Sequence, residues 1–159
     1  MEKIPFTRAG LEKLKEELSQ LKGSERQAVI QAIADAREHG DLSENAEYHA
    51  ARERQSFIEG RITELEDVTS RAEVIESARL TGETVTFGVK VVIVDEETDE
   101  EASYSIVGPY EADIAKARIS TGSPIARALI GKKVGDQAEV QSPRGPRPYE
   151  ILSIEVLPD

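Results

Sequence analysis

Leucines recur at intervals of three and four residues near the start of the chain, and this spacing constrains the fold more than any other feature. Side chains spaced in this way fall on one face of an α-helix and form the seam of a helix that packs along a partner helix. The residues in this seam are Leu11, Leu14, Leu18 and Leu21. Thr7 lies just before them and suits the N-cap position.

The seam is interrupted once and then resumes. Gly23 lies in the interruption, and one interior glycine costs a helix about 1 kcal/mol, which is enough for a bend. The apolar pattern returns after a four-residue skip, a stutter in the heptad, at Val29, Ile33 and Ala36. Gly40 follows, where a left-handed residue would end the helix.

A second helical pattern begins beyond Gly40. Small Ala46 and Ala50 would let two helices approach closely, and the larger residues follow at helical spacing, with Phe57 assigned to the core. These larger residues are Phe57, Ile58, Ile62, Leu65 and Val68. We therefore expect an antiparallel helical hairpin from Thr7 to about Val74. Each arm of about 30 residues would run roughly 45 Å at 1.5 Å per residue.

The second half has the two-residue period of β-strands. Residues 89–94 and 103–107 read as two strands joined by an acidic turn, and residues 136–142 and 148–157 read as a final pair. Pro148 lacks a backbone donor and marks this pair as an edge. The predicted fold class is α+β, with a coiled-coil hairpin over residues 1–76 and a small domain of antiparallel sheet and short helix over residues 80–159.

Charge and composition exclude several classes of protein. The net charge is -11 and is spread over both halves, which argues against general binding to a nucleic-acid backbone. The chain has no cysteine, which excludes disulfides and thiolate metal sites. No apolar run reaches the roughly 20 residues of a membrane span, and the N-terminus lacks the apolar core of a signal peptide. We expect a cytoplasmic protein without membrane contact.

Two carboxylates, Asp41 and Glu44, lie where the first helical pattern stops and the second starts. One interpretation is a capping box, in which Asp41 accepts from the backbone N–H of Glu44 and Glu44 reaches back. The other is a binding site for a hard cation such as Mg²⁺, which takes one or two carboxylates together with ligands from a substrate. Two exposed carboxylates alone hold Mg²⁺ weakly, so another macromolecule would have to complete such a site.

The sequence around these carboxylates resembles a known family. "IADAREHGDLSENAEYHAARERQSFIEGRI", residues 33–62, is similar to the tip hairpin of the bacterial transcript-cleavage factors, the Gre family, and "SPIARALIGKKVGD", residues 123–136, resembles the rim-binding segment of their C-terminal domain. The resemblance implies an FKBP-like fold for residues 80–159. It also implies that this domain sits on the rim of the secondary channel of RNA polymerase while the coiled coil enters the channel.

The resemblance further implies a role for the two carboxylates. Asp41 and Glu44 would act in trans, as metal-binding and catalytic residues that supply ligands or oriented waters to a Mg²⁺ ion shared with the polymerase. Two metals would then support attack of water on a phosphodiester near the backtracked 3′ end of the nascent RNA. The factor itself would be no enzyme, would bind no Mg²⁺ tightly when free, and would be a monomer in the free state.

Further residues match functional positions of the family. Arg37 and Arg52 match a basic patch that faces the RNA; the alternative is that they pair with Glu38, Glu44 or Glu53 at helical spacing, for about 0.2–0.5 kcal/mol each. Arg54 is a weaker candidate of the same kind.

Ser123, Pro124 and Ile125 match the segment that binds the polymerase. Their alternative is a plain helix start, with Ser123 as the cap, Pro124 as the first helical residue and Gly131 closing the helix. Asn45 and Tyr48 are expected to shape the tip. His39 and His49 are interpreted as solvated, because two histidines on different helices without cysteine make a poor zinc site.

Three other functions remain to be weighed. A channel-blocking inhibitor of the same shape is disfavoured, because related inhibitors have altered acidic tips whereas "GDLSEN" matches the cleavage-competent pattern. A peptidyl-prolyl isomerase needs an aromatic-lined pocket, and residues 79–159 contain one Phe, three Tyr and no Trp. A coiled-coil adaptor would leave the acidic tip without a role.

Overall fold

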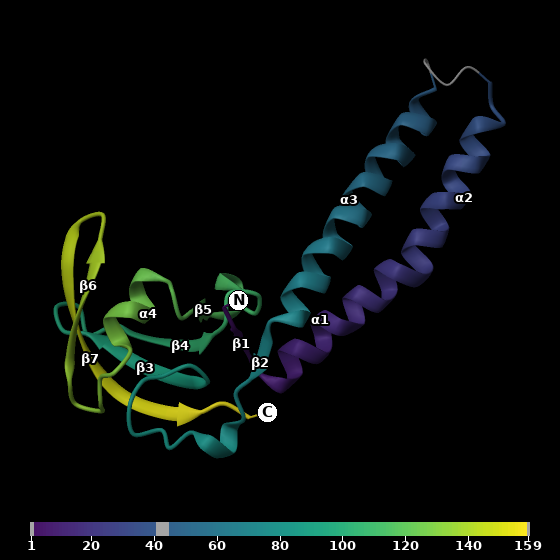
Figure 1. The fold of residues 1–159 in the computed structure, drawn as a ribbon. Coiled ribbons are helices and arrows are strands. Elements are labelled where there is room, and N and C mark those ends of the chain that lie inside the picture. Colours follow the sequence, from purple (N-terminus) through teal and green to yellow (C-terminus); the bar gives the residue numbers. More distant parts are fainter. Residues whose placement is uncertain (1, 41–44, 159) are drawn as a thin grey trace. The chain divides into compact units, whose positions relative to one another are not determined.

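A computed structural model describes residues 2–40 and 45–158 of the chain. The chain forms two compact units, one of Leu11–Arg71 and one that combines Met1–Gly10 with Ala72–Asp159. Figure 1 follows the chain through both. Among the described residues, no helix combines the length and the apolar character needed to cross a membrane.

The first unit is the helical hairpin that the sequence predicts. Its first arm contains α1 (Arg8–Gln20), a π-helical turn (Leu21–Glu25) and α2 (Arg26–Arg37), and its second arm is α3 (Ala46–Ser70). The two arms run antiparallel (Figure 1). Thr7 caps α1 as expected, because its hydroxyl accepts from the backbone N–H of Gly10 at 3.1 Å.

The predicted seam is confirmed with two corrections. The buried residues of the two arms are Leu11, Leu14, Val29, Ile33, Ala36, Ala51, Ile58, Ile62, Leu65 and Val68, while Leu18 and Leu21 pack partly buried against this core. Phe57 is 71% exposed, so its assignment to the core is wrong. It precedes the buried Ile58 by one residue, and one residue rotates the side-chain direction by about 100° around the helix axis. The buried alanine is Ala51, seven residues before Ile58, whereas Ala46 and Ala50 are exposed.

The π-helical turn absorbs the interruption of the seam. Eight residues separate Leu21 from Val29, and at about 100° per residue a regular α-helix would carry Val29 about 80° past two full turns. A π turn advances by less rotation per residue, so both side chains reach the same core. Gln20 and Arg26, which flank the turn, keep right-handed helical backbones. The arm is therefore continuous through Gly23.

The second unit begins with a strand that the sequence pattern does not show. Strand β1 (Ile4–Phe6) pairs in parallel with β2 (Ala72–Val74), so the helical reading, which extended to about Val74, ends four residues earlier at Ser70. A three-residue strand whose partner lies almost 70 residues away contains too few side chains to show a period. Its pairing is decided by tertiary contacts.

The main sheet has five strands in the order β5-β4-β3-β7-β6. Their bounds are β3 Val89–Asp95, β4 Glu101–Val107, β5 Arg118–Ser120, β6 Gln137–Ser142 and β7 Gly145–Val156. All neighbours are antiparallel except β4 and β5. Both predicted strand pairs are confirmed, and the last pair reaches the edge of the sheet through β6; β7, which contains Pro148, has β3 and β6 as neighbours.

A single short helix packs on this sheet. Helix α4 (Pro124–Leu129) contributes Ala126 and Leu129 to a core that also contains Val89, Val91 and Ile93 of β3. Single 3₁₀ turns occur at Ser77–Arg79 and Ile114–Lys116. The unit therefore has the predicted α+β composition.

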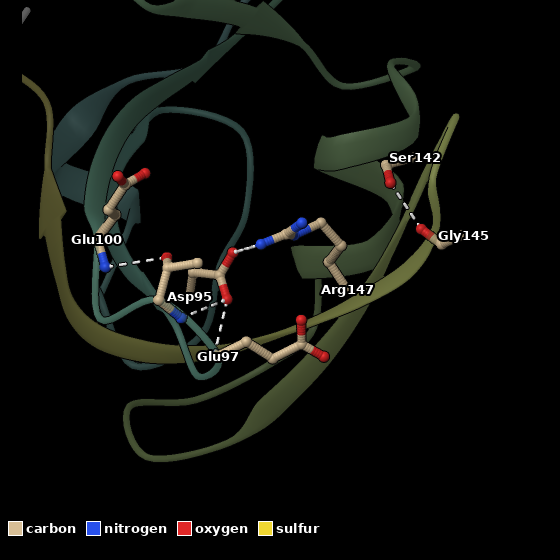
Figure 2. Close-up of polar contacts among 7 residues, drawn as sticks. Asp95, Glu97, Glu100, Ser142, Gly145 and Arg147 are labelled. Atoms are coloured by element: carbon tan, nitrogen blue, oxygen red, sulfur yellow. Dashed lines mark hydrogen bonds and ion pairs between the residues drawn. The ribbon is translucent and has the colours of Figure 1, made fainter.

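The buried end of β3 is polar. Asp95 is 5% exposed, and its carboxylate accepts from the Arg147 guanidinium at 2.6 and 3.0 Å and from the backbone N–H of Glu97 at 2.8 Å (Figure 2). These hydrogen bonds, with that from Arg147 the largest, lower the pKa of Asp95 below its ordinary value. The ion pair ties the acidic β3–β4 turn to β7. The rest of this turn, residues 96–101, is exposed, as the sequence indicates.

Candidate functional site

The tip of the hairpin is described on both of its sides. Helix α2 ends at Arg37, and the turn that follows reaches Gly40, whose φ is 113°; this positive φ fits the predicted glycine stop. Asp41 and Glu44 lie outside the described residues. Their proposed metal role is therefore still a prediction.

Asn45 is the N-cap of α3. Its backbone is extended, and its side-chain Oδ1 accepts from the backbone N–H of Tyr48 at 3.1 Å. An N-cap side chain bonds an N–H two or three residues further on, so this position fixes where the helix starts. The cap of α3 is thus Asn45 rather than Asp41, and the predicted hydrogen bonds between Asp41 and Glu44 lie outside the described residues.

The same asparagine also contacts the other arm. Its Nδ2 donates to the backbone carbonyl of Ala36 at 2.6 Å. Ala36 is 3% exposed and Ala51, in the facing helix, 7%. Small side chains at these two positions let the arms approach closely at the tip, as the sequence predicts for alanine, although at other positions.

Arg37 and Arg52 are exposed, and within the described part of the chain neither side chain forms a hydrogen bond or an ion pair. Of the expected alternative partners, Glu38 and Glu53 therefore form no ion pair with these arginines, and Glu44 lies outside the described residues. Arg54 differs, because its guanidinium binds Glu25 at 2.7 Å. Contact of these arginines with RNA is still a prediction.

Arg37 and Arg52 lie on one side of the hairpin. Each directly follows a buried seam residue, Ala36 in α2 and Ala51 in α3. Because the helices are antiparallel, one step along the chain rotates the side-chain direction in opposite senses in the two arms. Both arginines consequently reach the same side, which we call the arginine side.

Ion pairs along the hairpin agree with this geometry. Glu59 and Glu66 also directly follow buried residues of α3, and they bind Arg26 at 2.7 Å and Lys22 at 3.4 Å in the other arm. The hydrogen bond from Arg26 lowers the pKa of the Glu59 carboxyl below its ordinary value. Arg52 lies seven residues before Glu59 and continues this row toward the tip.

The charge pattern changes where this row nears the tip. Near the tip, the residue of α2 on the arginine side is Arg37. Arg52 of α3 therefore shares this side with another cation, whereas Glu59 and Glu66 share it with residues of opposite charge. Two guanidinium groups that have no carboxylate partner among residues 2–40 and 45–158 suit a phosphate, which arginine binds through several N–H donors. The arginine side near the tip can therefore hold an anion although the whole chain is acidic.

The predicted docking segment starts α4 in the second unit. Ser123 is the N-cap, with its Oγ accepting from the backbone N–H of Ala126 at 3.2 Å, and Pro124 is the first helical residue. Gly131, with φ of 91°, closes the helix as expected. Pro124 is exposed, whereas Ile125 packs partly buried against the core of the sheet. The helix-start reading is confirmed, and contact with a partner is still a prediction.

No metal centre of the protein's own is present among residues 2–40 and 45–158, where no group of three or more His, Asp or Glu side chains could hold an ion. His39 and His49 are exposed and belong to no such group. The donors expected for Mg²⁺, two carboxylates three residues apart, suit a hard cation whose other ligands come from elsewhere.

One buried carboxylate was not anticipated. The side chain of Glu111 is 4% exposed and accepts from the backbone N–H of Thr7 at 2.9 Å, from the Thr7 hydroxyl and from Arg118 at 3.3 Å. It therefore supports the first turn of α1 from a position 104 residues away in sequence. No local pattern could have indicated this contact.

Comparison with known proteins covers nearly the whole chain. Residues 4–74 match the family model described as "Transcription elongation factor, N-terminal", and residues 80–156 match "Transcription elongation factor, GreA/GreB, C-term". The curated transcription elongation factor GreA of Rhodospirillum rubrum is 62% identical over 154 residues, which cover 97% of this chain and 98% of that protein. That of Caulobacter vibrioides is 59% identical over 157 residues, which cover 99% and 100%. Among solved structures, GreA factor homolog 1 of Thermus thermophilus is 30% identical, with 96% and 99% of the two chains covered and a TM-score of 0.45.

Proposed function

Because this chain belongs to the GreA/GreB family of transcription elongation factors, we propose that it rescues RNA polymerase whose nascent RNA has backtracked. The hairpin enters the secondary channel of the polymerase, where the RNA 3′ end has been extruded. The second unit docks on the channel rim. The factor acts as a monomer in the cytoplasm and stimulates the polymerase's own cleavage of the RNA.

The chemistry belongs to the polymerase, and the factor supplies carboxylates. Asp41 and Glu44 would hold, directly or through waters, a Mg²⁺ ion that the polymerase alone binds poorly. Such an ion would supply Lewis-acid activation of the attacking water and stabilisation of the leaving oxygen. In the hydrolysis itself, water would add to phosphorus as the bond to the leaving oxygen breaks, and the 3′ fragment would be released. No covalent intermediate with the factor forms, so the factor is an accessory protein and not an enzyme.

The observation that carries this proposal is the position of the N-cap. Asn45 caps α3, so the start of this helix does not need the carboxylates of Asp41 and Glu44. A carboxylate that caps a helix uses its lone pairs on backbone N–H groups, and fewer are then left for an ion.

The arginine side supports contact with the RNA. Arg37 and Arg52 lack partners in the described residues, and two cations on one side near the tip favour the phosphates of the extruded strand. Arg54 is neutralised by Glu25 and contributes less. We expect Arg37→Ala and Arg52→Ala each to weaken RNA contact and leave the hairpin folded, because neither arginine takes part in its packing.

Rim docking is assigned to the start of α4. Ser123 and Pro124 fix the first turn rigidly, and Pro124 is exposed to a partner. Replacement of Pro124 by Glu should lower affinity for the polymerase in a competition binding assay. Unchanged affinity would remove this residue from the interface.

A cleavage assay tests the main proposal. Stalled, backtracked elongation complexes are incubated with the protein and Mg²⁺, and released RNA 3′ fragments are resolved on a gel. The wild type should release short fragments, and Asp41→Asn should release none above background while it still binds the polymerase. Glu38→Gln is the matched control, because it removes one exposed tip carboxylate of no proposed role. If Asp41→Asn cleaves like the wild type, the metal role is wrong.

The same assay separates the rival functions. A channel-blocking inhibitor would slow RNA synthesis without releasing fragments, and an adaptor would do neither. The isomerase reading finds little support in the second unit, where Tyr104 and Tyr149 pack against the core and Tyr110 stacks on Phe6.

A further inference from the structure

We propose that Asn45 is a positioning residue of the tip: its side chain ties the end of α2 to the start of α3 and so holds both ends of the segment that carries Asp41 and Glu44. This inference rests on the proposed function, because it concerns how those carboxylates are presented to the polymerase.

The side-chain amide is used at both ends. Its oxygen accepts from the backbone N–H of Tyr48 in its own helix, and its nitrogen donates to the carbonyl of Ala36 in the other arm, at 3.1 and 2.6 Å. The carbonyl of Ala36 is one of the last four of α2, which have no partner within the helix. A single side chain thus satisfies an otherwise unpartnered donor of α3 and gives a carbonyl at the end of α2 a donor from the other arm.

The chemistry of the amide explains why this residue is asparagine. Ser, Thr, Asp and Asn all serve well as N-caps. Aspartate accepts only and cannot donate to a carbonyl, and the shorter serine hydroxyl has one hydrogen and no separate donor group. Only asparagine combines the cap with an NH₂ group that reaches across. Replacement by Asp or Ser therefore removes the bond between the arms and leaves the cap.

The tie is built into a closely packed part of the hairpin. Ala36 and Ala51 are buried against the facing arms, which brings the Ala36 carbonyl within reach of Asn45. The same carbonyl also accepts from the backbone N–H of His39 at 3.2 Å. His39, after the end of α2, and Asn45, the N-cap of α3, therefore donate to the same carbonyl oxygen.

The expected consequence is catalytic rather than structural. Closing a short segment at its base reduces the conformations open to the residues within it. A displacement of about 1 Å in a reacting group can cost about a hundredfold in rate. Loss of the tie should therefore lower the maximal cleavage rate by about tenfold or more, while the protein concentration that gives half of this rate, set by docking, stays the same.

The test compares Asn45→Asp and Asn45→Ser with the wild type and Asp41→Asn in the backtracked-complex assay. Both Asn45 variants should keep the wild-type circular dichroism and polymerase affinity. Both should show the lower maximal rate and need more Mg²⁺ for half of it. The Ser variant guards against an effect of the added carboxylate in the Asp variant. Wild-type cleavage and Mg²⁺ dependence in both variants would overturn the inference and leave the proposed function intact. No fragments from the wild type would instead remove the proposed function, and this inference with it.

A second measurement needs no polymerase. The chain contains no cysteine, so Glu38→Cys and Glu47→Cys introduce two unique sites for spin labels at exposed positions on either side of the tip. The distance distribution between the labels should widen in the Asn45→Ser background. An unchanged distribution would show that the amide does not hold the two arms together, and would refute the tie directly.

Discussion

Deletion of Gly23 should stabilise the hairpin, although it shortens a core-forming helix by one residue. Leu21 and Val29 would then be seven residues apart, which at about 100° per residue is only about 20° short of two full turns. A regular α-helix could then present both side chains to α3, and the π-helical turn would no longer be needed. Everything beyond the deletion keeps its present face, including Ile33 and Ala36.

The magnitude follows from what the deletion removes. An interior glycine costs about 1 kcal/mol relative to alanine, and a Cβ at Gly23 would meet no atom within 4 Å, so no packing is lost. We expect the free energy of unfolding of the hairpin to rise by about 1 kcal/mol. For a unit of 60–100 residues this corresponds to an increase of about 4–8 °C in the unfolding midpoint.

Thermal unfolding followed by circular dichroism at 222 nm measures the effect, because α1, α2 and α3 contain most of the helical residues. Deletion of Gly60 is the matched control: this glycine also has open space around it but lies within the regular helix α3. Removing it turns Ile62, Leu65 and Val68 by about 100° away from the seam. Each buried aliphatic side chain is worth about 2–5 kcal/mol, so the control should unfold at a much lower temperature or fail to fold.

The two deletions therefore have opposite predicted signs. If deletion of Gly23 lowered the midpoint as deletion of Gly60 does, the spacing of eight residues between Leu21 and Val29 would not be one residue too long for a regular α-helix. The π-helical turn would then not be what brings both side chains to the same core.

Three further predictions concern single residues. Phe57→Ser should change the free energy of unfolding by less than about 0.5 kcal/mol, whereas Ile58→Ala, one residue on, should lower it by about 2–5 kcal/mol; equal effects in chemical denaturation would contradict the assignment of the seam. Gly10→Ala should destabilise the second unit by about 1–3 kcal/mol in the same measurement, because the new Cβ would overlap the buried carboxylate of Glu111; a stabilised variant would show that this carboxylate moves freely. The pKa of Asp95 is lowered by its arginine partner, so its contribution is present above the ordinary aspartate value and is lost as pH falls below about 4. The unfolding midpoint should fall more steeply there in the wild type than in Asp95→Asn, and parallel pH profiles would contradict this.

The sequence predicts the elements whose side chains repeat with a period. The leucine seam, the strand pairs and the Ser123-Pro124 helix start are each encoded within a few residues, by apolar spacing or by cap chemistry, and the structure has them where they are expected. The fold class follows from these patterns together.

Other features depend on contacts between residues that are far apart. Nothing near Ile4 or Ala72 indicates that the two would pair, and nothing near Glu111 indicates that it supports the first turn of α1. Both contacts form within the second unit when distant parts of the chain come together, so a local pattern cannot contain them.

The errors at the tip have a more local cause. Asp41 and Asn45 are both good N-caps; the D-x-x-E spacing favours Asp41, whereas the side chain of Asn45 caps α3. The helical pattern includes Phe57 in the core, but its position one residue before Ile58 turns its side chain away from the seam. A step of seven residues back from Ile58, about two helical turns, leads to Ala51, which is buried.

The dependence of RNA cleavage on Mg²⁺ concentration tests most directly whether the factor brings ligands to an ion in the polymerase. The rate of fragment release from backtracked complexes is measured over a range of Mg²⁺ concentrations, without the factor, with the wild type and with Asp41→Asn. We predict that the wild type lowers the Mg²⁺ concentration needed for half of the maximal rate and that Asp41→Asn does not. A wild-type factor that raised the maximal rate but left this concentration unchanged would contradict the delivery of metal ligands by the tip.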